Sequence, residues 1–366
     1  DTGKTHRVIH TAIPTALLGG VILTVVGVFL SETFLVWMKT PDDVLPLSAL
    51  YMKIYFAGII FMMIYNFCAA ILRASGDTKS PLIFLTIAGV INVVLNVIFV
   101  TVFRLNVAGV ALATTISQAV SAILVMVALI KRDDACKLHL SQIKFYKDEI
   151  LQIIKVGLPA GIQGSLFSIS NMLLQTGYNS LGSVVVNAKV AAMNVDGYIY
   201  NILNSFYHTC LTFCSQNFGA KRFDRVKKVF FTGTASVTIL GLALGIFVYV
   251  FAAPLVGIFN SDPEILVYAK QRLALVALPY FLCGLMDVGS GFLRSIGYSL
   301  QALIVTFLGS CVLRITWIYT VFPKFNDVRA LYVVFPISWL VTASILFVMF
   351  FIGYKKEKRM IMHKLK

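Results

Sequence analysis

Long apolar runs separated by short polar connections constrain this sequence more than any other feature. A helix needs about 20 mostly apolar residues to cross the hydrocarbon core of a bilayer, whereas a strand of a membrane barrel alternates over ~10 residues. Ten runs are long enough for helices: residues 10–38, 47–72, 81–103, 107–130, 150–180, 184–215, 229–258, 265–293, 299–322 and 329–354. The sequence therefore predicts an all-α polytopic membrane protein with ten membrane-spanning helices present in this chain.

The charge of the chain fits a membrane protein better than a protein that binds nucleic acid. Only 13% of the residues are charged, whereas soluble proteins contain about 25%. The net charge is +15, and the basic residues gather in every second connection: the start of the chain, the loop with Arg73 and Lys79, residues 131–155, residues 221–228, the loop with Arg294 and the end of the chain. Because basic loops stay in the cytoplasm, we expect a multi-pass protein with a cytoplasmic C-terminus, partnered by the lipid bilayer and by no nucleic acid.

Two similar stretches occur at equivalent places in the chain. The stretches "LRASGDTKSP" (residues 72–81) and "LRSIGYSLQA" (residues 293–302) each join two apolar runs, and the chain aligns with itself at a shift of 221 positions. Six runs separate the copies, so both copies keep the same orientation in the membrane, as in many transporters built from repeats. The sequence therefore predicts two pseudo-symmetric six-helix lobes related as a parallel repeat.

The two expected lobes are unequal in this chain, because four apolar runs precede residue 131 and six follow it. We expect residues 1–130 to be the remainder of the first lobe (helices 3–6) and residues 131–149 to be a cytoplasmic linker. Residues 150–354 would be the second lobe (helices 7–12), and residues 355–366 a basic cytoplasmic tail. The mismatch leads us to expect two further helices upstream of Asp1, and a natural ten-helix protein is the alternative.

The repeated stretches have a simple mechanical interpretation. Arg73 and Arg294 would anchor helix ends at the anionic cytoplasmic leaflet, and Gly76 and Gly297 would allow a tight turn. Asp77 would cap the following helix. Both loops are therefore expected to be structural rather than to contact substrate.

No residue pattern typical of an enzyme or a metal site is found. The six cysteines give no disulfide framework, and Cys210 and Cys214 lack His or carboxylate neighbours, so buried apolar thiols are the better interpretation. The sequence contains no HExxH, no P-loop and no nucleophile paired with a base. We therefore expect neither enzymatic activity nor a cofactor or bound metal.

Several motifs resemble the multidrug and toxic compound extrusion (MATE) family, in its bacterial branch. They are "NFCAAILRASGDTKSPLIFLTIAGVINVVLN", "IIKVGLPAGIQGSLFSISNMLLQTGYNSLGS", "SQNFGAKRFDRVKKV" and "GLMDVGSGFLRSIGYS". The resemblance covers the whole chain and implies twelve helices in two lobes, of which the first two helices are lacking here. It also implies export of organic, often cationic, compounds from the bacterial inner (cytoplasmic) membrane, driven by entry of Na⁺ or H⁺ as the coupling ion.

The run at 150–180 is unusually polar for a membrane helix. Residues 164, 168, 171, 175 and 179 share one helical face, which reads Gly, Ser, Asn, Gln, Asn. A water-filled cavity would suit this face, and hydrogen bonds between helices are the alternative. The substrate or cavity candidates on this helix are Gln163, Ser168, Asn171, Gln175 and Asn179.

Charged residues inside the apolar runs are costly in hydrocarbon and usually face a cavity or a partner. Asp287 is expected to face a central path, with a local pair to Arg294 as the alternative. Asp196 is expected to face a cavity together with its polar neighbours Asn194, Tyr200 and Asn201. Glu32 is better explained by an interfacial salt bridge. Arg314 could bind an anionic group, but a carboxylate partner or a side chain that reaches the interface is favoured.

The resemblance also implies two places for a coupling ion, and neither is intact. Asn92 and Asn96 lie one turn apart where some relatives carry Asn and Asp, and Thr114 matches a further polar position. The second-lobe positions hold Phe167 and Cys283, and the nearest acid is displaced by one turn to Asp287. The candidates for cation coupling are therefore Asn92, Asn96, Thr114, Asp196 and Asp287.

The expected function is a monomeric, cation-coupled antiporter that exports small organic substrates by alternating access of two lobes. A flippase for lipid-linked oligosaccharides is the first alternative. A flippase would require more cationic residues in the cavity than this sequence leads us to expect. A truncated membrane protein that does not transport is the second alternative.

Overall fold

The computed structural model describes residues 2–37 and 40–364, and the chain divides into two compact units, residues 1–153 and 154–366. The first unit contains α1 (Thr2–Trp37), α2 (Leu45–Ala57), α3 (Ile59–Ala74), α4 (Lys79–Val97) and α5 (Asn106–Ile130). A π-helical segment, η1 (Ile98–Val102), extends α4, and a short 3₁₀ turn, η2 (Leu140–Gln142), lies in the connection that follows α5. Helix α6 (Lys147–Ser180) begins in the first unit and lies mainly in the second.

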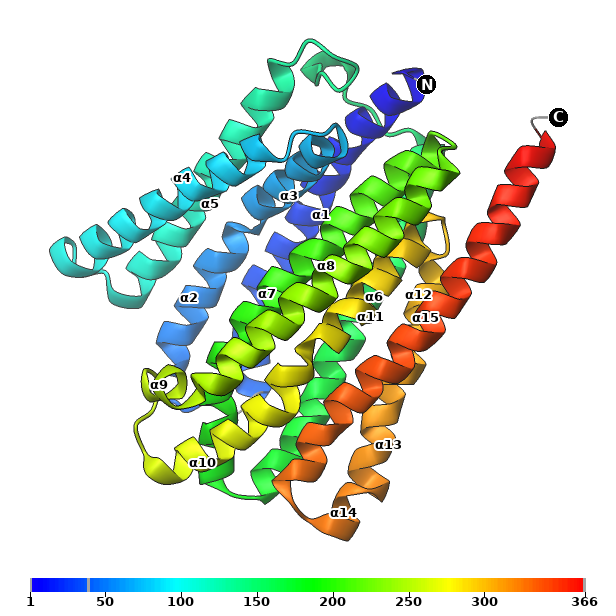
Figure 1. The fold of residues 1–366 in the computed structure, drawn as a ribbon. Helices are drawn as coiled ribbons and strands as arrows, with labels where there is room; N and C mark the ends of the chain where they lie inside the picture. The colour runs from blue at the N-terminus through cyan, green and yellow to red at the C-terminus, as the bar shows by residue number, and fades with distance from the viewer. Residues whose placement is uncertain (1, 38–39, 365–366) are drawn as a thin grey trace. The chain divides into compact units, whose positions relative to one another are not determined.

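The second unit is built on four long helices that run side by side (Figure 1): α7 (Ser183–Gly219), α8 (Phe223–Val250), α11 (Phe281–Ser295) and α15 (Val328–Lys364). Shorter elements complete the unit. They are α9 (Ala252–Gly257), α10 (Pro263–Arg272), the π-helical η3 (Leu273–Ala277), the 3₁₀ turn η4 (Leu278–Tyr280), α12 (Ser299–Thr306), the π-helical η5 (Phe307–Val312), α13 (Leu313–Thr320) and α14 (Phe322–Phe325).

The expected all-α membrane architecture is confirmed. Within the described residues, nine helices are long and apolar enough to cross a membrane, and they match nine of the ten expected spans. The remaining span, 184–215, is α7, which has 37 residues but carries many polar ones. Helix α15 continues to Lys364, so the basic residues from 355 to 364 extend this helix.

The core of the second unit combines a close helix approach with an aromatic cluster. A side chain at Gly245 of α8 would meet the carbonyl oxygens of Ala277 and Leu278 at 2.8 and 2.7 Å, so only glycine permits this contact. Nearer the start of α8, the ring of Phe230 stacks on that of Phe350 with centroids 5.1 Å apart. Backbone proximity positions α8 against η3 and η4, and ring packing positions it against α15. The residues described below lie on α15 and on α11, the helix that follows η4.

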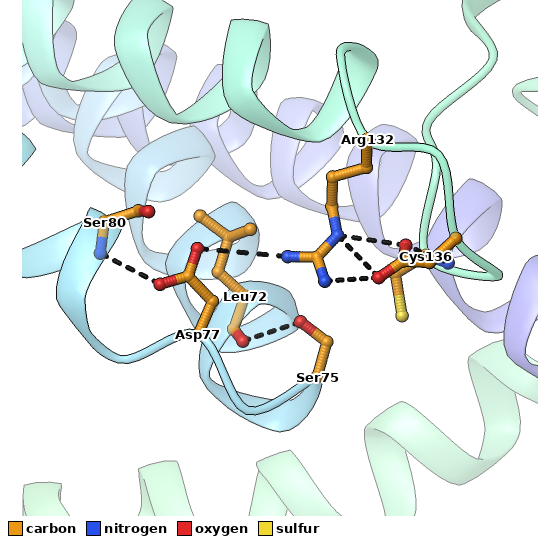
Figure 2. Close-up of polar contacts among 7 residues, drawn as sticks. Leu72, Ser75, Asp77, Ser80, Arg132 and Cys136 are labelled. Carbon is orange, nitrogen blue, oxygen red and sulfur yellow. Dashed lines mark hydrogen bonds and ion pairs between the residues drawn. The ribbon is translucent and has the colours of Figure 1, made fainter.

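Both repeated hairpins turn through glycine, as predicted. Gly76 has φ +94° and Gly297 has φ +93°, a conformation that side chains with a Cβ rarely adopt. In the first hairpin, Oδ1 of Asp77 accepts a hydrogen bond from the backbone N–H of Ser80 at 3.0 Å, which caps α4 (Figure 2). The other carboxylate oxygen lies 4.0 Å from the Arg132 guanidinium, so the hairpin is tied to the start of the linker.

The two repeated arginines are not equivalent, which corrects the expectation that both anchor at the membrane surface. Arg73 is half-buried, but Arg294 is only 8% exposed. Arg294 donates hydrogen bonds to Tyr207 Oη at 2.5 Å and to Gln163 Oε1 at 2.6 Å. It therefore joins α6, α7 and α11 inside the second unit rather than reaching the lipid head groups.

Replacing Asp77 with Ala should lower the free energy of unfolding by about 1 kcal/mol at pH 7, because the N-terminus of α4 loses its cap. Burial disfavours the charged carboxylate, but hydrogen bonds from Ser80 and the charge of Arg132 outweigh it, so the pKa of Asp77 lies below its usual value. The contribution is therefore present above the unfolded pKa of about 3.9 and is lost as the pH falls through the lower folded value.

Denaturant unfolding followed by circular dichroism at pH 7 and at about pH 3 would check this prediction. Thr78→Ala is the matched control, because the Thr78 side chain forms no cap hydrogen bond. A deficit of Asp77→Ala that is unchanged at the lower pH would contradict the assigned role of the carboxylate.

Candidate functional site

A cavity of about 380 Å³, here called the Asp287 cavity, lies inside the second unit. Helix α6 contributes the predicted polar residues Ser168 and Asn171 to its wall, and α11 contributes Asp287. Apart from Arg314, the remaining lining is largely aromatic or apolar, and it comes from six elements: Gly164, Phe167, Tyr200, Tyr280, Cys283, Met286, Arg314, Phe335 and Trp339. The cavity therefore combines one carboxylate with ring faces, which suits an amphipathic organic molecule.

Asp287 faces this cavity rather than pairing with Arg294. Its Oδ2 accepts a hydrogen bond from Asn204 Nδ2 at 3.4 Å. The two terminal nitrogens of Arg294 instead donate hydrogen bonds to Tyr207 and Gln163. Among the ion pairs that the described residues form, none includes Asp287. The carboxylate is therefore available to a cation that enters the cavity.

Arg314 also lines the Asp287 cavity, and its environment differs from both favoured expectations. It is 3% exposed, so it does not reach the interface, and within the described residues it has no carboxylate partner. Its Nε donates to Ser338 Oγ at 3.0 Å, and its guanidinium lies 4.6 Å from the ring centre of Phe335. The guanidinium also lies within 6.0 Å of the ring centres of Phe167 and Trp339. A buried guanidinium held by a hydroxyl and by ring faces keeps a positive charge beside the cavity.

A second cavity, of about 240 Å³ and here called the Lys189 cavity, shares Asn171, Tyr200, Tyr280 and Phe335 with the first. Asp196 lines it, as predicted for a cavity-facing residue, but its carboxylate is already paired: Oδ2 accepts from Arg272 Nη2 at 2.8 Å and from Nε at 3.2 Å. The rest of the lining is Leu174, Tyr178, Lys189, Met193, Gly197 and Arg272 itself.

Lys189 and Arg272 line this cavity, and the sequence reasoning missed both of them. Lys189 stands two helical turns before Asp196 in "NAKVAAMNVD", which places both side chains on one face of α7. Arg272 ends α10 immediately before the π-helical segment η3, within an apolar run. With Arg314, three cationic residues line the two cavities, which corrects the expectation of few cationic residues.

The remaining candidates on α6 form hydrogen bonds between and within helices, the alternative that had been kept open for this face. Gln175 Oε1 accepts a hydrogen bond from Lys189 Nζ, and its Nε2 donates to Asn179 Oδ1 at 2.8 Å. Gln163 accepts from Arg294. The polar face of α6 thus divides: Gly164, Ser168 and Asn171 line cavities, and Gln163, Gln175 and Asn179 serve hydrogen bonds.

Two candidates on α7 lie away from these cavities. Asn194 and Asn201 are exposed and line neither the Asp287 cavity nor the Lys189 cavity.

In the first unit, Glu32 pairs with Lys53 at 3.1 Å, the salt bridge expected for it.

The three polar candidates of the first unit are brought together by α4 and α5. Asn92 Nδ2 lies 3.4 Å from both Thr114 Oγ1 and Ser117 Oγ, and Asn96 Nδ2 donates to Asn92 Oδ1 at 3.0 Å. Ser117 was missed by sequence reasoning, although its position one turn after Thr114 could have revealed it. The cluster is neutral, so its role in cation coupling stays a prediction.

Cysteines and metals give no further site in the described part of the chain. Cys68, Cys210, Cys214, Cys283 and Cys311 are buried free thiols, as expected. Among the described residues, no three His, Cys, Asp or Glu side chains are grouped so that they could hold a metal ion.

Comparison with known proteins identifies relatives of this chain. A family model described as MatE matches residues 2–98 and 159–320. The chain is 31% identical to the probable multidrug resistance protein YpnP of Bacillus subtilis over 79% of its own length and 64% of that relative, less than two thirds of it. It is 27% identical to the probable multidrug resistance protein YoeA of the same organism, over 97% of this chain and 78% of YoeA.

The fold is shared with solved transporters. The structure of the Vibrio cholerae MATE transporter VcmN in the bent form covers 98% of this chain with a TM-score of 0.86 at 19% identity, and the match spans 81% of VcmN. An outward-facing multidrug resistance MATE transporter of the MOP superfamily gives a TM-score of 0.89 over 96% of this chain and 80% of its own, also at 19% identity.

Proposed function

The chain belongs to the MatE family, a family of membrane transporters rather than enzymes, and we propose that it exports organic, often cationic, amphipathic compounds in exchange for Na⁺ or H⁺. It is a multi-pass membrane protein embedded in a lipid bilayer. The proposal places it in the bacterial inner membrane as a monomer with a cytoplasmic C-terminus. The proposed cycle is alternating access, in which the lobes expose the binding site to one side of the membrane at a time.

The observation that carries this proposal is the Asp287 cavity. A carboxylate attracts a cationic group, and the ring faces of Phe167, Tyr200 and Trp339 provide both apolar area and cation–π attraction. The relatives named above as multidrug resistance proteins support the same class of substrate.

For the coupling ion, Asp287 is a better candidate than Asp196. The Asp196 carboxylate is committed to Arg272 inside the protein, so taking up a proton or Na⁺ would require breaking a buried ion pair. The neutral cluster at Asn92, Asn96 and Thr114 offers only amide and hydroxyl oxygens to an ion. We therefore propose that the coupling ion and the substrate compete for binding to the Asp287 carboxylate.

A flippase for lipid-linked oligosaccharides is the second candidate, because Lys189, Arg272 and Arg314 line the cavities and could hold a phosphate group. The carboxylate of Asp287 and the aromatic wall favour an exporter of amphipathic compounds instead. The two candidates differ in whether a simple organic cation is moved.

Reconstituted vesicles can separate the two candidates. Vesicles loaded with Na⁺, or with an acidic lumen, should accumulate a cationic rhodamine ester only when they contain the protein, because outward movement of the ion drives the dye inward. Movement of a labelled polyprenyl-linked glycan, without gradient-dependent movement of the dye, would replace the exporter with the flippase.

A further inference from the structure

The Lys189 cavity holds more positive than negative charge. Its lining contains two cationic side chains, Lys189 and Arg272, and one carboxylate, Asp196. Asp196 is bonded to Arg272 through Nε and Nη2, so the charge of Lys189 is left without a counter-charge. Lys189 Nζ donates to the neutral Gln175 Oε1 and lies 4.8 Å from the ring centre of Tyr178.

Arg272 also has unused hydrogen-bonding capacity. The residue is 4% exposed, and within residues 2–37 and 40–364 its Nη1 has no hydrogen-bond partner. A guanidinium nitrogen left unpaired away from water costs free energy that a ligand acceptor recovers. The ion pair with Asp196 fixes the Arg272 side chain and leaves Nη1 unpaired, so Nη1 can donate a charge-assisted hydrogen bond to an anionic oxygen.

We propose that the Lys189 cavity binds the carboxylate or phosphate group of an amphipathic organic anion. The ammonium of Lys189 contacts the anion, and the unpaired Nη1 of Arg272 supplies a second hydrogen-bond donor. Tyr178, Tyr280 and Phe335 form the apolar part of the wall against which the rest of the molecule packs. That this ligand is transported rests on the proposed function, whereas the binding of an anion in this cavity does not depend on it.

The position of the cavity gives this site a consequence for selectivity. It shares lining residues with the Asp287 cavity, so one molecule can present a cationic group to Asp287 and an anionic group to Lys189. An organic cation without an anionic group gains nothing from Lys189. A free carboxylate on the ligand should therefore increase affinity.

A rhodamine free acid and its methyl ester are suitable probes, because they share one cationic ring system and differ only in the carboxylate. Fluorescence anisotropy with the purified full chain in detergent should show about tenfold tighter binding of the acid than of the ester. Lys189→Gln should remove this preference by weakening acid binding about tenfold while changing ester binding less than about twofold.

Two further variants make the test specific for charge in the cavity. Lys270→Gln removes the same charge from an exposed position on α10 and should leave both affinities unchanged. Gln175→Glu keeps Lys189 but gives it a carboxylate partner of the same shape, so it should also abolish the preference for the acid. Equal binding of both dyes by the unmodified chain, or equal losses of both dyes in Lys189→Gln, would overturn the proposal.

The source of the anion and the proposed function are tested separately. Competition by phosphatidylglycerol that disappears in Lys189→Gln would identify a lipid head group as the occupant, and absence of competition would identify a soluble amphipath. Binding is measured without an ion gradient. If the chain binds the acid more tightly than the ester but moves no dye in vesicles, the proposed transport function is wrong and the proposed anion site still stands.

Discussion

Asp287→Asn should reduce gradient-driven export of the cationic rhodamine ester by at least about tenfold. Two unit charges 4 Å apart attract each other by about 4 kcal/mol at an effective dielectric of about 20, and about 1.4 kcal/mol already corresponds to a factor of ten. Asn keeps the shape of the side chain but removes the charge that faces the Asp287 cavity. The affinity of the ester and the coupling to the ion gradient should therefore fall together.

Two control variants decide how the Asp287 result is understood. Asp287→Glu restores the charge and should recover a substantial part of the export. Glu32→Gln removes a carboxylate from the exposed pair with Lys53 and should have little effect. Export by Asp287→Asn at the unmodified rate, with an unchanged dependence on pH and Na⁺, would remove Asp287 from both substrate binding and coupling.

Local physical rules were sufficient to predict the helices and some of the site from the sequence. The number of apolar residues in a run reflects the thickness of a bilayer, so nine of the ten expected spans match membrane-length helices among the described residues. The ends of the spans are less well placed, as at residue 354, beyond which α15 continues to Lys364. Helical periodicity placed Ser168 and Asn171 on the face that lines the cavities. The glycine turns at Gly76 and Gly297 followed from their repeated context.

Pairings between distant helices could not be predicted in this way. Asp196 and Arg272 are 76 positions apart, and nothing in either local stretch indicates the partner. Arg272 directly precedes the π-helical segment η3, and Arg314 lies just after the π-helical segment η5. A π-helical turn changes the direction of neighbouring side chains relative to a regular α-helix. Arg294 was misjudged because its hairpin suggested the membrane surface, whereas its partners on α6 and α7 become visible only in three dimensions.

Asp196→Ala should be among the most destabilising single substitutions in this chain. Both members of the ion pair are about 95% buried, with side-chain exposures of 5% each. Removing one member of such a pair leaves an uncompensated charge inside the protein, which costs about 3–5 kcal/mol. For a unit of this size, that loss corresponds to a fall in Tm on the order of 10 °C.

The buried cysteines provide the measurement for this last prediction. A thiol-reactive dye reaches the buried Cys214 and Cys311 only when the second unit unfolds, so the rise of its fluorescence above the constant signal of the partly exposed Cys136 reports the Tm in detergent. The double variant Asp196→Leu with Arg272→Met, which removes both charges, should recover most of the lost stability, because replacing a whole buried pair by apolar residues is often nearly neutral.

Two comparisons test whether the effect comes from the unpaired charge. Glu32→Ala breaks an exposed pair and should change the Tm little, since such pairs contribute about 0–1 kcal/mol. In Asp196→Asn, Arg272 lacks its counter-charge, so the rhodamine free acid should raise the Tm more than it does in the unmodified chain, and the ester should not. A double variant as unstable as Asp196→Ala would show that packing around Asp196, rather than its charge, holds α7 to α10.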